Sequence, residues 1–97
     1  MKIAITQLGG MDPSIVFNLP VIDTANLAPS ATSEVQALLA RLKFFDLPEH
    51  VVSDDLGSDL MQYRISVTDG ARQHVVRVDQ GAMARTGLLR LIELASA

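Results

Sequence analysis

The 97-residue sequence contains no cysteine, which excludes disulfides, thiolate zinc sites and cysteine nucleophiles. No apolar run approaches the ~20 residues that a membrane-spanning helix needs, so we expect no membrane partner. Positive charge is scarce as well: eight Lys and Arg residues stand against 11 Asp and Glu, for a formal net charge of -3. Because proteins that bind nucleic acid usually carry a basic face, we expect no nucleic-acid partner.

Apolar residues, in contrast, make up 48% of the chain, which is enough for a core at this length. We therefore expect a single domain over residues 1–97. The chain opens with a short apolar alternation that Gly9 and Gly10 interrupt, a pattern typical of a strand and not of a signal peptide. We expect cytoplasmic synthesis, with export by a non-classical route left open.

Four segments alternate between apolar and polar residues, which predicts half-buried strands over residues 2–8, 14–22, 60–68 and 72–79. In the second segment Ile15, Phe17 and Leu19 would lie on one face, and Pro20 would end the strand or place it at an edge. Asp69 and Gly70 form a strong hairpin signal between the last two strands. The inward faces of these two strands would carry Met61, Tyr63, Ile65, Val67, Val76 and Val78.

Two further segments show helical spacing. The first begins near Pro29, with Ser30 or Thr32 as the N-cap, and is closed by Phe44 and Phe45. Its apolar face would consist of Val35, Leu38, Leu39 and Leu42, and that of the second helix, residues 84–96, of Leu88, Leu91, Ile92 and Ala95. The order ββαββα predicts an α+β fold: a four-stranded antiparallel sheet with two helices packed on one face.

This order brings three connections to one end of the sheet: residues 8–14, 46–60 and 79–84. In this arrangement the first helix runs back along the strands. Residues 46–60 contain five carboxylates and no Lys or Arg, and a connection of this length is more often functional than idle. Loops grouped on a rigid scaffold are where binding sites usually lie.

The two histidines, His50 and His74, show no metal-binding spacing. A zinc site of His50 with Asp54 and Asp55 can be drawn, but a solvated loop explains these residues as well, and the calcium-loop pattern is absent. His74 shares the parity of Val76 and is expected to be a partly buried strand residue. We expect no catalytic residue, no metal and no cofactor, which leaves a small non-enzymatic binding module.

Gly9 and Gly10 lack the spacing of a phosphate-binding loop and predict a hairpin turn with positive φ. Met11 follows them at the tip of the turn, where an adaptable apolar side chain is suited to contact a partner.

Three longer motifs fill the second half of the chain: FFDLP at 44–48, DLMQYRISVTDG at 59–70 and HVVRVD at 74–79. Together with Gly9 and Gly10 they resemble the emfourin family, small bacterial proteins that inhibit thermolysin-like zinc metalloproteases such as protealysin. The family pattern has a first strand ending in Gly-Gly, a helix closing in FFxLP, a QYxIxVxDG strand and turn, an HxVRVD strand and a C-terminal helix. The chain follows it in order over nearly its whole length.

The resemblance implies an inhibitor that is not itself an enzyme and whose partner is a thermolysin-like metalloprotease. Such a protease cleft holds a zinc ion and prefers large apolar side chains after the scissile bond. The implied partner-binding residues are therefore Leu8, Met11 or Leu56 in the apolar pocket, Asp54 or Asp55 facing the zinc ion or its surroundings, and Gly9, Gly10 and Gly57 for close backbone approach. Family members often carry a basic residue before the two glycines and another glycine soon after them. Gln7–Leu8 and Met11–Pro13 depart from this pattern, which implies a different affinity or target choice.

Two other classes stay open on the residues alone. One is an interaction module with a different partner that binds at an exposed strand edge, as open sheet edges readily do. The other is a small enzyme that uses His50 or His74 with the acidic loop. In the inhibitor reading we expect the free protein to be a monomer.

Overall fold

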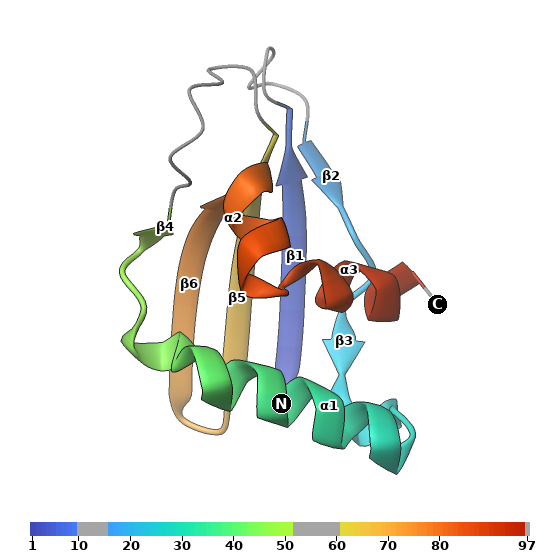
Figure 1. The fold of residues 1–97 in the computed structure, drawn as a ribbon. Helices are drawn as coiled ribbons and strands as arrows, with labels where there is room; N and C mark the ends of the chain where they lie inside the picture. Colours follow the sequence, from blue (N-terminus) through green and yellow to red (C-terminus); the bar gives the residue numbers. More distant parts are fainter. Residues whose placement is uncertain (10–15, 52–60, 97) are drawn as a thin grey trace.

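The computed structural model describes residues 1–9, 16–51 and 61–96, which form an α+β fold around one mixed sheet (Figure 1). The strands are β1 (Lys2–Leu8), β2 (Val16–Asn18), β3 (Ile22–Asp23), β4 (His50–Val51), β5 (Gln62–Asp69) and β6 (Arg72–Asp79). The α-helices are α1 (Pro29–Leu42), α2 (Gln80–Thr86) and α3 (Leu89–Ser96), with short 3-10 turns η1 (Thr24–Asn26) and η2 (Phe44–Asp46). The expected α+β class is confirmed, whereas the four-stranded antiparallel sheet with two helices in the order ββαββα is wrong.

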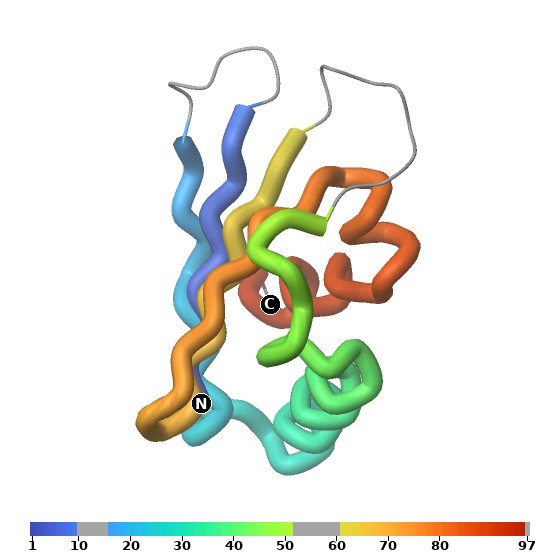
Figure 2. Tube along the Cα trace, turned by 90° about the vertical axis from the view of Figure 1, so that its left-hand side faces the viewer, coloured from blue at the N-terminus to red at the C-terminus, as the bar shows by residue number. Residues whose placement is uncertain are grey.

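The sheet is built on three long antiparallel strands in the order β1-β5-β6. The short strands β2 and β3 both pair with β1 at one edge, and β4 pairs in parallel with β6 at the other. The helices lie on one face of the sheet, and no other described segment covers the opposite face, which we call the uncovered face (Figure 2).

The β5–β6 hairpin forms where the alternation and the Asp69–Gly70 signal predict it. Its turn has Gly70 and Ala71 as central residues, and only Gly70 has a positive φ, +62°. A positive φ at the first central position is typical of a type II′ turn, whose twist matches that of the flanking strands. The inward residues of both strands are buried, apart from Met61, which is half-buried.

The predicted strand over residues 14–22 is wrong, because it is interrupted at Pro20. Its two described pieces pair with different parts of β1: β2 with Thr6–Leu8 and β3 with Lys2–Ile3. Phe17 of β2 is 58% exposed. The register places Phe17 opposite Gln7, on the face of the sheet that bears the helices, but the helices do not bury its side chain. Ile15 lies outside the described residues.

The connection after α1 also differs from the prediction. α1 runs crosswise over the strands near the β5–β6 turn and does not run back along them (Figure 1). The chain then makes η2 and a two-residue strand, β4, inside the segment expected to be a structureless loop. The predicted N-caps Ser30 and Thr32 are wrong as well: Ala28 occupies the N-cap, with Pro29 as the first helical residue. The helix ends at Lys43, whose φ of +51° closes it in the left-handed region.

The C-terminal segment forms two helices instead of the single helix predicted over residues 84–96. The Asp79 carboxylate caps α2 by accepting a hydrogen bond from Ala82 N at 2.8 Å. Gly87, with φ +84°, ends α2 in the left-handed conformation that Gly adopts without strain. A Cβ at Gly87 would lie 3.1 Å from Arg41 Nη2 on α1, so the junction also packs closely against that helix.

The core lies between the sheet and the helices. The predicted apolar face of α1 is confirmed, with Val35, Leu38 and Leu39 buried and Leu42 half-buried. The side chains that are less than 2% exposed are Ile3, Ile5, Val35, Phe44, Ile65, Val67, Val76, Val78, Met83, Leu88 and Leu91. Among the described residues, no helix is both long and apolar enough to cross a membrane.

Candidate functional site

The strand ends that border the predicted loops lie together at one end of the sheet. Leu8 at the end of β1 pairs with Val16 of β2 and with Gln62 at the start of β5. Gln62 in turn pairs with Asp79, the last residue of β6. We call this end of the sheet the loop end. The described ranges stop or resume near it, at Gly9, Val16, Val51 and Met61.

Only two of the predicted partner-binding residues are described, and the loop end positions both. Leu8 and Gly9 are half-buried at the end of β1, with Leu8 on the parity of the uncovered face. The other six, Gly10, Met11, Asp54, Asp55, Leu56 and Gly57, lie outside the described residues.

Polar contacts hold the described part of the loop end in place. Met61 receives two of them: its backbone carbonyl accepts from Gln80 N at 2.9 Å, and its sulfur lies 3.4 Å from Gln7 Nε2. Asp79, only 7% exposed, fixes the start of α2 beside them. These contacts join β1, β5 and α2 at the point from which the loops leave.

The FFDLP and HVVRVD motifs meet at the other end of β6. His74 Nε2 lies 2.7 Å from the Leu47 carbonyl oxygen, and since a carbonyl can only accept, Nε2 donates. The His74 ring also packs edge-on against Phe44, with centroids 5.8 Å apart. The expectation that His74 is a partly buried strand residue is confirmed, and its side chain ties the segment after α1 to the sheet.

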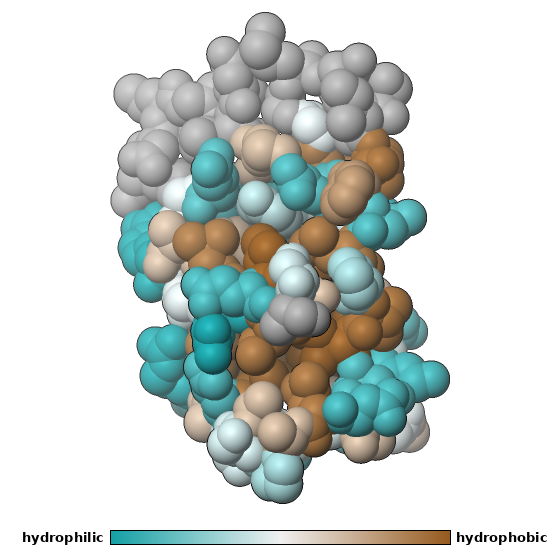
Figure 3. Space-filling view, turned by 90° about the vertical axis from the view of Figure 1, so that its right-hand side faces the viewer, coloured by the Kyte–Doolittle hydropathy of each residue, from teal (hydrophilic) through white to brown (hydrophobic). Residues whose placement is uncertain are grey.

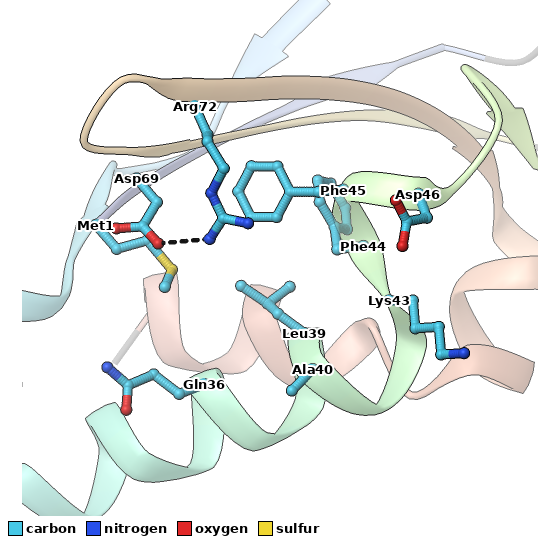
Figure 4. Close-up of a pocket in the computed structure, with 10 residues that line it drawn as sticks. All are labelled: Met1, Gln36, Leu39, Ala40, Lys43, Phe44, Phe45, Asp46, Asp69 and Arg72. Carbon is cyan, nitrogen blue, oxygen red and sulfur yellow. Dashed lines mark hydrogen bonds and ion pairs between the residues drawn. The ribbon is translucent and has the colours of Figure 1, made fainter.

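A groove of about 290 Å³ lies beside this junction, between α1, η2 and the β5–β6 turn (Figure 4). Arg72 reaches across it: its guanidinium carbon lies 4.1 Å from the centroid of the Phe45 ring, and Nη2 lies 3.1 Å from Asp69 Oδ2. Cation–π and ion-pair contacts therefore already satisfy Arg72. We assign the groove to the scaffold because it lies far from the loop end.

The uncovered face carries a second polar feature, which the sequence analysis missed. Arg64 of β5 stands directly opposite Arg77 of β6, and both side chains are exposed. The same row across the sheet contains Thr6 of β1, which pairs with Arg64, and His50 of β4, which pairs with Arg77. The Asp69–Gly70 signal would not have revealed the pair, because a two-residue turn at Asp69–Gly70 would place Val75 opposite Arg64, whereas the observed turn centres on Gly70–Ala71.

The histidine and acidic residues give no described metal site. His50 is exposed on β4, and its proposed partners Asp54 and Asp55 lie outside the described residues. Within residues 1–9, 16–51 and 61–96, no group of three His, Asp or Glu side chains is placed to hold a metal ion.

The fold and this arrangement define a small α+β protein with strand ends gathered at one end of the sheet, a geometry suited to binding. The model of the Emfourin family matches residues 6–95, and the chain belongs to this family, a family of protealysin inhibitors. Membership implies that the chain is not an enzyme. Comparison with curated proteins and with solved structures gives no significant match.

Proposed function

We propose that the chain inhibits thermolysin-like zinc metalloproteases of the protealysin type by inserting its loop end into their active-site cleft. Membership of the Emfourin family over residues 6–95 carries this proposal. The convergence of the β1, β2, β5 and β6 ends supports it, because those ends border both segments with candidate contact residues. A scaffold that fixes its binding end before association loses less entropy on binding.

Each candidate residue has a role that follows from the chemistry of the target cleft. Leu8, Met11 or Leu56 fills the apolar pocket, and Asp54 or Asp55 faces the zinc ion or its surroundings. Gly9, Gly10 and Gly57 let the backbone approach the cleft wall closely. In this proposal the free inhibitor is a monomer and forms a 1:1 complex with the protease.

The test is the inhibition of a panel of thermolysin-like proteases, with serine and cysteine proteases as controls. We expect tight, stoichiometric inhibition confined to the thermolysin-like set. Met11→Ala and Leu56→Ala should each raise the inhibition constant at least about tenfold, which corresponds to about 1.4 kcal/mol. Leu89→Ala is the matched control, since it makes the same change at a leucine on α3 that is 38% exposed. Unchanged inhibition in both loop variants would place the contact elsewhere.

One observation favours a second candidate, an interaction module that binds its partner along β2. β2 is an edge strand, and on this side Val16, Phe17 and Val21 are 52%, 58% and 61% exposed. Figure 3 shows this side of the molecule, where hydrophobic side chains gather. Such an edge offers unpaired backbone groups and apolar side chains to an added strand.

Phe17→Lys separates the two candidates, because a charge on an edge strand opposes strand addition. If the loop end is the contact, this variant inhibits like the wild type while Met11→Ala and Leu56→Ala are weakened. If β2 is the contact, Phe17→Lys abolishes complex formation and the two loop variants bind normally.

A further inference from the structure

Arg64 and Arg77 form a like-charge pair on the uncovered face, in the part nearer the loop end. Directly opposite side chains of an antiparallel pair have Cβ atoms roughly 4.5–5.5 Å apart, and like charges at this distance destabilise the sheet. Arg64 and Arg77 occupy such positions on β5 and β6. The chain therefore holds two guanidinium groups close together where their repulsion costs stability.

Within the described residues, neither guanidinium forms an ion pair or side-chain hydrogen bond. The other arginines with described contacts differ: Arg72 is paired with Asp69, Arg90 with Glu34 and Glu93, and Arg41 donates to the Thr86 carbonyl oxygen. Among the described residues, no side chain therefore takes up the hydrogen-bonding capacity of these two guanidinium groups.

The surroundings of the pair form a shallow hollow suited to an acidic side chain. The hollow has a volume of about 330 Å³ and is lined by Glu49, His50, Arg64, Val75 and Arg77. Val75, 39% exposed, offers apolar surface for the aliphatic stem of a carboxylate side chain. Glu49 is the one carboxylate in the lining and leaves the two arginines in excess. Two guanidinium groups can each bind a carboxylate through two parallel hydrogen bonds.

The pair also lies close to the loop end. Arg64 is two residues along β5 from Gln62, and Arg77 is two residues along β6 from Asp79. Two residues of an antiparallel strand span about 7 Å. A protein seated on the loop end can therefore cover the arginines without a further change of shape.

We propose that the Arg64–Arg77 pair is a second contact surface, which binds aspartate or glutamate side chains on the rim of the protease cleft. The inference rests on the proposed function and adds the chemistry of the partner's surface. The pair attracts an acidic rim and so selects, among thermolysin-like proteases, those that carry carboxylates beside the cleft. Charged rim contacts of this kind act mainly on association rate and specificity.

The test compares Arg64→Gln/Arg77→Gln with Lys43→Gln/Arg72→Gln. Both double variants remove two positive charges, but the second pair lies beside the groove on the helix-bearing side, so the overall charge effect is matched. Association rates and inhibition constants are measured at about 0.05 M and about 0.5 M NaCl for several thermolysin-like proteases that the wild type inhibits, some with acidic and some with neutral or basic cleft rims. Circular dichroism verifies that each variant is folded.

At low salt we expect Arg64→Gln/Arg77→Gln to slow association and raise the inhibition constant about tenfold, while the control stays within about twofold of the wild type. At high salt the difference should shrink, because screening shortens the reach of surface charges. Arg64→Lys/Arg77→Lys should restore the association rate more fully than the inhibition constant, since lysine keeps the charge but not the two-pronged hydrogen bonding.

Three outcomes overturn the proposal. If the open-face variant and its control behave alike at both salt concentrations, the surface makes no contact with the protease, while the proposed inhibition stands. Slower association with every protease tested, whatever the charge of its rim, removes the claim of selection. If the wild type inhibits no thermolysin-like protease, both the proposed function and this inference fail.

Discussion

Replacing His74 by alanine should destabilise the fold more than its half-buried position on β6 suggests. The side chain makes two kinds of contact with the segment that follows α1: a hydrogen bond to the Leu47 carbonyl at 2.7 Å and an edge-on ring contact with Phe44 at 5.8 Å. A further ring, Phe45, lies 6.5 Å away. Alanine removes all three contacts at once.

The expected magnitude follows from these contacts. A hydrogen bond of this kind contributes about 1 kcal/mol net, and an edge-to-face ring pair contributes roughly 0.5–1.5 kcal/mol beyond burial. His74→Ala should therefore lower the free energy of unfolding by about 2 kcal/mol. For a domain of this size, about 1 kcal/mol corresponds to a Tm change of roughly 4–8 °C, so the Tm should fall by about 8–16 °C.

Urea and thermal unfolding followed by circular dichroism measure this change, and two variants separate its parts. His74→Gln keeps a donor near the Leu47 carbonyl but loses the ring, and His74→Phe keeps a ring but loses the donor. Each should lie between wild type and His74→Ala. The reasoning is refuted if His74→Ala unfolds within about 0.5 kcal/mol of the wild type, the range of an ordinary surface substitution.

Three further substitutions test the junctions of the helices. Gly87→Ala should lower the unfolding free energy by about 1–2 kcal/mol in urea, because a Cβ at φ +84° is strained and would lie 3.1 Å from Arg41 Nη2; a stability equal to wild type would show that the junction relaxes freely. Asp79→Ala should cost at least about 1 kcal/mol through loss of the α2 cap, whereas Asp79→Asn keeps an acceptor and should lose less; equal losses in both variants would exclude capping as the cause. The hydrogen bond from Arg90 lowers the pKa of Glu34, so its contribution to stability is present above the ordinary carboxylate range and is lost as the pH falls through the lowered value. Urea unfolding should thus separate wild type from Glu34→Gln at about pH 7, and the difference should shrink as the pH falls below the ordinary carboxylate range; a constant difference would contradict the ion pair.

The sequence predicts the long helices and strands well, because each is long enough to repeat its pattern of apolar and polar residues several times. Residues 62–69 and, apart from Val75, residues 72–79 alternate on both sides of the turn, so the two strands and their buried faces follow. The register does not, because the turn centres on Gly70–Ala71 and not on Asp69–Gly70. The apolar spacing of Val35, Leu38 and Leu39 likewise predicts the buried face of α1. In these elements local pattern and tertiary packing favour the same structure.

The short strands β2, β3 and β4 could not be predicted, because two or three residues are too few to show a periodic pattern of apolar and polar residues. β4 is held by two pairs with β6, and these depend on where α1 and η2 place the chain and not on its local sequence. The division at Pro20 was visible, but alternation on both sides of it favoured one long strand. The sequence also contains a signal for the division at Gly87: Asp79 can cap the start of a helix and Gly87 can end it. The apolar spacing over residues 84–96 nevertheless favours one continuous helix.

The candidate site was predictable only as a place in the fold. Strand order alone predicts that the ends of β1 and β6 and the start of β5 lie together, and the register confirms this. The roles of Met11 and Leu56 depend on the shape of a partner, which no pattern within one chain encodes. The observed register of the β5–β6 hairpin sets the position of the Arg64–Arg77 pair. The function proposed for the pair depends on the charge of the partner surface that covers it.

Scaffold residues of the FFDLP and HVVRVD motifs fix the path of the backbone between α1 and the loop end. After α1, the backbone is held at Leu47 by His74, at Glu49 by a 2.7 Å hydrogen bond from Arg77 N, and at Val51 by pairing with β6. The backbone up to Val51, the last residue described before position 61, is therefore held at three alternate residues. Because ordering the chain on binding costs affinity, the proposed inhibition would also depend on Leu47 and His74, which fix the approach to β4 from the far end of β6.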